Sequence, residues 1–141
     1  MNLLSPVSSI MDRDLHVVSP NDCINHIKDI FELKRVVNLP VLKQGLIIGI
    51  INKQRFRSFC EGLNKHADTT SLQKYLHLHT AEEVMNKRVL ALEVQDCISL
   101  ALEMLRDNVF SALPVLDGQK LVGIVTSLDI IKTLAKDKVM N

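Results

Sequence analysis

The chain has 141 residues, of which 47% are hydrophobic and 23% are charged, a composition typical of a folded protein. Its 17 basic and 16 acidic residues give a net charge of +1, which offers no electrostatic basis for binding nucleic acid or an anionic membrane. No apolar run reaches the ~20 residues that span a bilayer, and the N-terminus does not read as a secretion signal. The three cysteines form no CxxC pair, so we expect reduced thiols in a cytoplasmic protein.

The first part of the chain predicts one strand, a helix, two strands and a second helix. The ranges are a strand over 15–18, a helix opened by Asp22, strands over 39–42 and 46–51, and a helix over 53–63. Asp22 is expected to be the helix N-cap, because its carboxylate can accept free first-turn N–H groups. Ile24, Ile27 and Phe31 form the apolar stripe of that helix.

Residues 64–80 are predicted to be a linker, with a turn at 68–71. After this linker the same order of elements returns. The ranges are a strand over 89–92, a helix opened by Asp96, strands over 112–116 and 121–125, and a helix over 127–135. Asp117-Gly118 between two apolar runs is a strong signal for a β hairpin.

An internal repeat with an offset of 74 residues links the two halves. Ten identities share this register without a gap: Met11, Asp22, Cys23, Ile24, Leu39, Pro40, Val41, Leu42, Gly49 and Ile50 each recur 74 positions later. The sequence therefore predicts an α/β (α+β) fold made of two βαββα repeats. We assign residues 1–63 to the first repeat with an N-terminal segment, and 81–141 to the second repeat with a C-terminal tail.

The repeated elements resemble a tandem pair of cystathionine-beta-synthase-type (CBS) domains, also called a Bateman module. The resemblance rests on the element order, on Leu-Pro-Val in the second strand of each repeat, and on Gly-Ile-Val-Thr-Ser-Leu-Asp over 123–129. It covers about 6–136 and implies two repeats related by pseudo-twofold symmetry and packed through their sheets. It also implies a stand-alone module, a homodimer, and clefts that often hold adenine nucleotides or related ligands.

The resemblance assigns ligand-binding roles in the second repeat. Asp129 would bond the ribose hydroxyls and Thr126 would meet a phosphate. The residues expected to line the same cleft are Leu113, Pro114, Gly123, Ile124 and Ala91. Chemistry alone favours another interpretation for Thr126 and Asp129, because Thr and Asp are common helix-capping residues. Core packing is likewise a sufficient role for Leu113 and Pro114.

The first repeat departs from this pattern at both polar positions. Asn52 replaces the threonine and Arg55 replaces the aspartate. Arginine has no acceptor for a ribose diol, although its planar fork can hold a phosphate or carboxylate. We therefore expect one adenosyl cleft, with Arg55 either a possible anion contact or a solvated surface residue.

A further departure lies on the first strand of each repeat. The family often has a threonine there that lines the cleft, whereas this chain has Val17 and Ala91. The cleft is therefore expected to be more apolar than usual and to favour a ligand with less phosphate.

Two classes of function follow from these residues. In the first, the chain is a regulatory module that binds AMP, ADP, ATP or a related adenosyl compound, requires no cofactor, and signals to an effector protein. In the second, it is a ligand-free scaffold for protein interactions, and Thr126 and Asp129 only cap a helix. No set of nucleophile, base and acid, no metal-ligand cluster and no phosphate-binding glycine loop is evident, so an enzyme is not expected.

Overall fold

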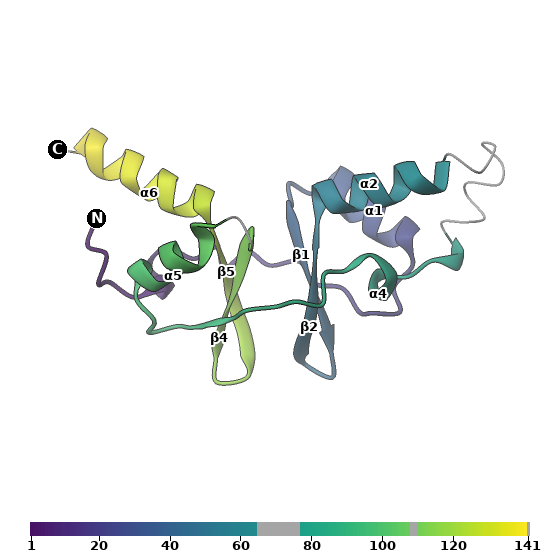
Figure 1. Ribbon diagram of the computed structural model, residues 1–141, viewed down its shortest axis with the longest axis horizontal. Coiled ribbons are helices and arrows are strands. Elements are labelled where there is room, and N and C mark those ends of the chain that lie inside the picture. Colours follow the sequence, from purple (N-terminus) through teal and green to yellow (C-terminus); the bar gives the residue numbers. More distant parts are fainter. Residues whose placement is uncertain (65–76, 108–109, 141) are drawn as a thin grey trace. The chain divides into compact units, whose positions relative to one another are not determined.

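The computed structural model describes residues 1–64, 77–107 and 110–140, and the chain forms two compact units. The first unit is His16–Arg88, and the second unit combines Met1–Leu15 with Val89–Asn141. Each unit has helices against a small sheet, which confirms the predicted mixed α/β class (Figure 1). The turn predicted at 68–71 lies outside the described residues.

Apart from the first strand of each repeat, the helices and strands follow the predicted order, and the structure adds α4 and η1. The first unit contains α1 (Ile24–Leu33), β1 (Asn38–Lys43), β2 (Leu46–Asn52), α2 (Lys53–Asn64) and α4 (Ala81–Val84). The second unit contains the 3₁₀ turn η1 (Val7–Ser9), β3 (Leu92–Glu93), α5 (Ile98–Leu105), β4 (Ala112–Asp117), β5 (Lys120–Thr126) and α6 (Ser127–Met140).

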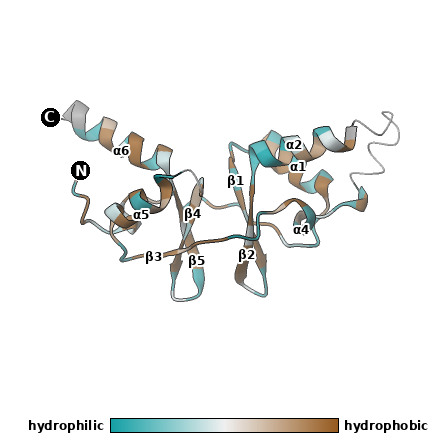
Figure 2. Cartoon of the chain, in the orientation of Figure 1, coloured by the Kyte–Doolittle hydropathy of each residue, from teal (hydrophilic) through white to brown (hydrophobic). Residues whose placement is uncertain are grey.

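The two hairpins are the most regular parts of the fold. β1 pairs with β2 and β4 pairs with β5, both antiparallel and in equivalent registers. Gly45 and Gly118 adopt positive φ angles of 79° and 66° in the turns, a conformation that suits glycine. Figure 2 shows hydrophobic strands and hydrophilic turns in both hairpins. The predicted hairpins are thus confirmed.

The predicted first strands are shorter in the structure. Val18 makes only an isolated parallel bridge with Val41, and β3 has two residues, which pair in parallel with β4. The remaining residues of the predicted strands, 15–17 and 89–91, lie outside any strand. Periodicity did not reveal this shortening, because the chain leaves one unit and enters the other at these two places.

The predicted helix caps are wrong by one residue. The N-cap positions are Cys23 and Cys97. Asp22 instead accepts a hydrogen bond from the Ser19 N–H at 2.8 Å, and Asp96 accepts one from Glu93 at 2.8 Å. Each carboxylate therefore fixes the turn before its helix.

Each unit has its own aliphatic core. The predicted stripe of Ile24, Ile27 and Phe31 is buried in the first unit. The core of the second unit contains Val7, Met11, Leu92, Ala101, Leu105, Leu113, Val115, Val125 and Ile130. Leu, Ile and Val dominate both cores, as expected for a chain without tryptophan.

The opening segment of each sequence repeat packs in the unit of the other repeat. We call 6–12 and 80–86 the exchanged segments. Asp12 pairs with Ile124 of β5 through two backbone hydrogen bonds, and Asn86 pairs in the same way with Ile50 of β2. The compact units group residues 1–15 with residues 89–141, whereas the sequence repeat runs over 1–63.

A methionine in each exchanged segment lies directly over a glycine of the neighbouring strand. A Cβ on Gly49 would lie 2.5 Å from Met85 Sδ, and one on Gly123 would lie 2.4 Å from Met11 Sδ. Both methionines are buried. The two glycines are thus explained by a close approach between a strand and an exchanged segment.

Candidate functional site

The junction between β5 and α6 brings Thr126 and Asp129 together. Thr126 ends the strand and Asp129 lies in the first helical turn. Asp129 Oδ2 accepts hydrogen bonds from the Thr126 N–H at 2.8 Å and from the Thr126 hydroxyl at 3.0 Å. The Asp129 N–H lies 3.4 Å from Thr126 Oγ1. These reciprocal bonds form the capping box that satisfies backbone donors at a helix start.

The capping role does not use the whole Asp129 carboxylate. Within the part of the chain that the structure describes, both hydrogen bonds that the carboxylate accepts from Thr126 end on Oδ2. A carboxylate offers about four lone-pair sites, so Oδ1 keeps acceptor capacity for a ligand hydroxyl. Both side chains are half-buried. The geometry therefore satisfies the capping interpretation and also leaves the chemistry that a ribose diol requires.

The hairpin of the second unit carries most of the other predicted site residues. Pro114 pairs with Ile124, and both are buried. Leu113 is fully buried and belongs to the core cluster of this unit. Ile124 also exchanges two backbone hydrogen bonds with Asp12. Core packing and strand pairing account for these three residues within the unit.

Gly123 and Ala91 have different surroundings. The face of Gly123 on which a side chain would stand is filled by Met11, which explains why glycine is required there without a ligand. Ala91 is half-buried and comes directly before β3. Sequence reasoning missed Ala112, which pairs with Thr126 across the hairpin. Counting back from the turn would have paired Ala112 with Val125, because the sequence does not reveal the register shift between Val115 and Leu116.

The corresponding junction in the first unit is closed by Asn52. Its Oδ1 accepts hydrogen bonds from the backbone N–H groups of Gln54 at 2.9 Å and Arg55 at 3.3 Å. Its amide nitrogen donates to Asn38 Oδ1 at 3.3 Å. Asn52 thus caps α2, and its two polar atoms already have protein partners.

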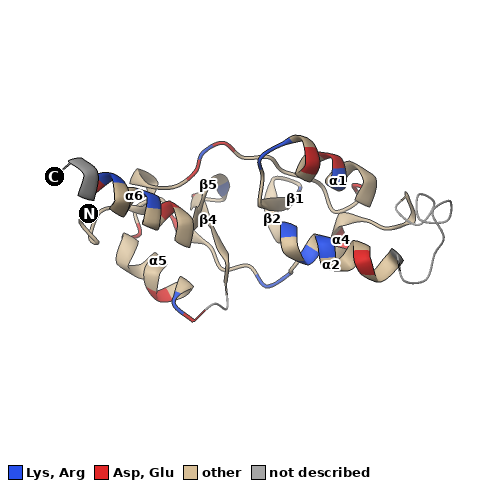
Figure 3. Ribbon diagram, turned by 90° about the horizontal axis from the view of Figure 1, so that it is seen from above, with Lys and Arg blue, Asp and Glu red and all other residues tan. Residues whose placement is uncertain are grey.

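Arg55 takes a role that the sequence did not indicate. Its Nε donates to the backbone carbonyl of Val84 at 2.8 Å. Val84 is the last residue of α4, where carbonyl groups lack partners within the helix. Arg55 is therefore tied to an exchanged segment of its own unit, and the residue stays exposed to solvent. Figure 3 shows basic residues along α2 and an acidic residue at the start of α6.

The cysteines differ in their electrostatic surroundings. Hydrogen bonding with the Ser99 hydroxyl, 3.0 Å away, and with the Leu100 N–H lowers the pKa of the Cys97 thiol. Burial raises the pKa of the Cys60 thiol.

The described residues contain no group of three metal-ligating side chains. No helix in the same part of the chain is long and apolar enough to cross a membrane.

A family model for the CBS domain matches residues 7–62 and 81–136, which together exceed half of the chain. The chain therefore belongs to the CBS domain family and carries two tandem copies of the domain. This confirms the resemblance drawn from the repeat.

The fold is shared with solved CBS-pair structures. Protein MJ1225 of Methanocaldococcus jannaschii is 24% identical over 92% of this chain. Its crystal structure gives a TM-score of 0.80 at 23% identity, covering 95% of this chain and 49% of that one. CBSX2, solved in complex with AMP, gives 0.76 at 22% identity, with 95% and 98% coverage. The CBS pair of MJ0100, solved with 5′-methylthioadenosine and S-adenosyl-L-methionine, gives the same four values.

The relatives found by sequence are longer than this chain. The match spans 47% of MJ1225 and 22% of the inosine-5′-monophosphate dehydrogenase of Thermoplasma acidophilum, which is 26% identical over 124 residues. The shared part is the CBS pair.

Proposed function

We propose that this CBS pair is a non-catalytic regulatory module that binds one adenosine-containing metabolite at the start of α6. The observation that carries the proposal is the half-buried Thr126–Asp129 pair, whose carboxylate keeps one oxygen for ligand hydroxyl groups. The α6 N-terminus adds free N–H groups and positive potential, which favour an anion. AMP in CBSX2 and the adenosyl compounds in MJ0100 support this ligand class.

The proposal places the ligand in the second repeat only. In the first repeat Asn52 is used by backbone amides and by Asn38, and Arg55 is bonded to Val84. Arg55 keeps its terminal guanidinium nitrogens as a possible contact for a phosphate or carboxylate. An anion-specific role for Arg55 is therefore compatible with its structural bond.

The signal would pass to a cytoplasmic effector protein, and the module would act as a homodimer. An exposed apolar stripe on α6 supports a protein contact: Leu128, Ile131 and Leu134 are 54%, 58% and 49% exposed. The repeat-related positions of α2 are Gln54, Arg57 and Cys60, which lack this character. Sedimentation equilibrium of Ile131→Glu beside the parent protein tests the homodimer, which the substitution should dissociate.

Thermal unfolding in the presence of AMP, ADP, ATP, S-adenosyl-L-methionine, 5′-methylthioadenosine and NAD tests the ligand. A compound that binds only the native state adds about 2.7 kcal/mol of stability at a hundred times its Kd. We expect one adenosyl compound to raise the unfolding midpoint by several degrees, and Asp129→Ala to abolish the shift.

Asp96→Ala is the matched control for this experiment. Asp96 also accepts a backbone hydrogen bond before a helix of the second unit, so its loss should lower stability without removing the ligand shift. If every compound leaves the midpoint unchanged, or if Asp129→Ala keeps the shift, the regulatory proposal fails. The ligand-free scaffold is then the better interpretation of the capping box.

A further inference from the structure

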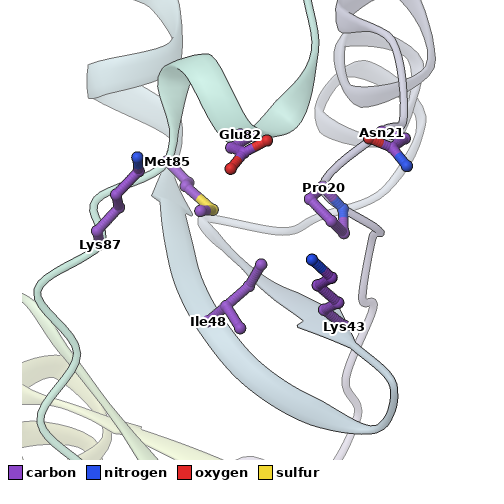
Figure 4. Close-up of a pocket in the computed structure, with 7 residues that line it drawn as sticks. All are labelled: Pro20, Asn21, Lys43, Ile48, Glu82, Met85 and Lys87. Atoms are coloured by element: carbon purple, nitrogen blue, oxygen red, sulfur yellow. The ribbon is translucent and has the colours of Figure 1, made fainter.

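The first unit contains a surface pocket of about 310 Å³ on the side of its hairpin that carries the exchanged segment. Its lining residues are Pro20, Asn21, Lys43, Ile48, Glu82, Met85 and Lys87 (Figure 4). Ile48, Met85 and Pro20 make an apolar floor, and the charged side chains stand around it. The pocket lies away from the Asn38–Asn52 end of the hairpin, since Lys43 pairs with Leu46 at the opposite, turn end.

The charged groups of the pocket come from separate elements. Lys43 is the last residue of β1, Glu82 is in α4, and Lys87 follows the exchanged segment. In Figure 4 the Lys43 amine points into the space below Glu82, and Lys87 stands on the other side of Ile48. Among the described residues, no ion pair involves any of these three side chains. The pocket thus offers two cationic groups and one carboxylate that form no ion pair with the residues the structure describes.

The second unit does not repeat this set of charges. At the offset of 74, Asp117 replaces Lys43, Arg13 replaces Lys87 and Ser8 replaces Glu82. Arg13 also donates from Nη2 to the Ser8 carbonyl at 3.0 Å, which holds its side chain against its own segment. The arrangement of two lysines and one glutamate is therefore a property of the first unit and does not follow from the repeat.

We propose that this pocket binds a small amino dicarboxylate, the chemical class of L-glutamate and L-aspartate. The two carboxylates of such a ligand would pair with Lys43 and Lys87, and its ammonium group would pair with Glu82. Its methylene groups would lie on Ile48 and Met85. The ligand charges of −2 and +1 complement the pocket charges of +2 and −1, whereas a monocarboxylate or a simple cation would leave one lysine or both unpaired.

Binding at this site would also hold the exchanged segment in place. Glu82 and Met85 belong to that segment, and Lys43 and Ile48 belong to the hairpin on which it packs. A ligand that contacts both sets of residues binds only when the segment is docked. Amino dicarboxylates should therefore raise the unfolding midpoint, independently of adenosyl compounds at α6.

Isothermal titration calorimetry at low ionic strength tests the proposal, because exposed charges are strongly screened by salt. The probes are L-glutamate, L-aspartate, glutarate and L-leucine. Glutarate lacks the ammonium group, and L-leucine lacks the second carboxylate. We expect saturable binding of one of the two acidic amino acids, at least ~10-fold tighter than glutarate or L-leucine, because each of these two probes leaves one charged group of the pocket without a partner.

Three variants assign the binding to the pocket. Lys43→Gln and Lys87→Gln should each weaken amino dicarboxylate binding by ~10-fold, and Glu82→Gln should remove the preference over glutarate. Lys120→Gln, at the exposed hairpin turn of the second unit, is the matched control and should bind like the parent. The proposal is overturned if neither acidic amino acid gives saturable heat, or if the pocket variants bind as the parent does. It does not depend on the outcome with adenosyl compounds.

Discussion

The junction between the last strand and the last helix occurs once in each repeat, and the two copies close it with different chemistry. In the second unit Asp129 turns back onto Thr126, and the two side chains cap α6 together. In the first unit Asn52 caps α2 alone, and Arg55 reaches away to the Val84 carbonyl. The first turn of the last helix needs a side-chain hydrogen-bond acceptor, and either a carboxylate or an amide oxygen supplies it.

The comparison separates what capping requires from what ligand binding requires. Capping uses one acceptor atom, and an amide oxygen supplies it as well as a carboxylate does. A ribose diol needs an acceptor with lone pairs left after capping is complete. Asp129 has them, whereas the amide group of Asn52 is already shared between two backbone N–H groups and Asn38.

The largest expected change in stability comes from the two glycines on which the exchanged segments pack, and it shows whether the two units tolerate added volume there equally. Gly49→Ala and Gly123→Ala each place a methyl group within 2.5 Å of a buried methionine sulfur. We expect each to lower the free energy of unfolding by about 1–3 kcal/mol, because a packed core resists added volume. Urea unfolding measures the change.

Gly62→Ala is the control for both glycine variants. Gly62 lies within α2, and nothing lies within 4 Å of the position that its Cβ would take. Alanine should raise stability there by about 0.5–1 kcal/mol, because alanine is the better helix former. If Gly49→Ala or Gly123→Ala costs nothing, the close contact with the exchanged segment does not hold in solution.

The next effect in size compares the two residues at the fourth position of the junction. Asp129→Ala should lower the free energy of unfolding by about 1–2 kcal/mol, because it removes half of a capping box. Arg55→Ala should cost about 1 kcal/mol, because the Val84 carbonyl loses its donor. Chemical denaturation of both variants measures the difference. If Arg55→Ala leaves the free energy of unfolding unchanged, the hydrogen bond to the Val84 carbonyl does not stabilise the fold.

The smallest effect concerns thiol reactivity. The lowered pKa of Cys97 and the raised pKa of Cys60 predict that iodoacetamide at pH 8 alkylates Cys97 first, because the thiolate is the nucleophile. Peptide mass spectrometry over time measures both rates. Ser99→Ala should slow the alkylation of Cys97 and leave the alkylation rate of Cys60 unchanged. Equal rates in the parent protein would contradict the hydrogen-bonded thiol.

Sequence reasoning gave the elements that local chemistry determines. The Asp-Gly turn, the alternation of apolar runs and the 74-residue register placed the hairpins and the last helices within one to five residues of their observed ends. The pairing of Thr126 with Asp129 followed from a spacing of three at a helix start.

The remaining features depend on partners that are distant in sequence. Val84 is the partner of Arg55, and Met11 explains Gly123, yet no local pattern links these pairs. The caps were misplaced because the Asp22 carboxylate can bond an upstream amide as well as a downstream one, and spacing does not distinguish the two. The sequence does not predict the exchange of segments for the same reason. The 74-residue offset identifies equivalent positions in the two repeats, but it does not tell in which unit a segment packs.

The placement of residues 1–15 with 89–141 has a consequence for how the chain is made. During synthesis the ribosome releases the segment that contains Met11 long before the strand on which it packs. The first unit, His16–Arg88, is contiguous and can fold as soon as it emerges, whereas the second must wait for nearly the whole chain. During that interval the apolar segment that contains Met11 is exposed. A chaperone can bind it, or its methionine can pack over Gly49 of the first unit in place of Met85.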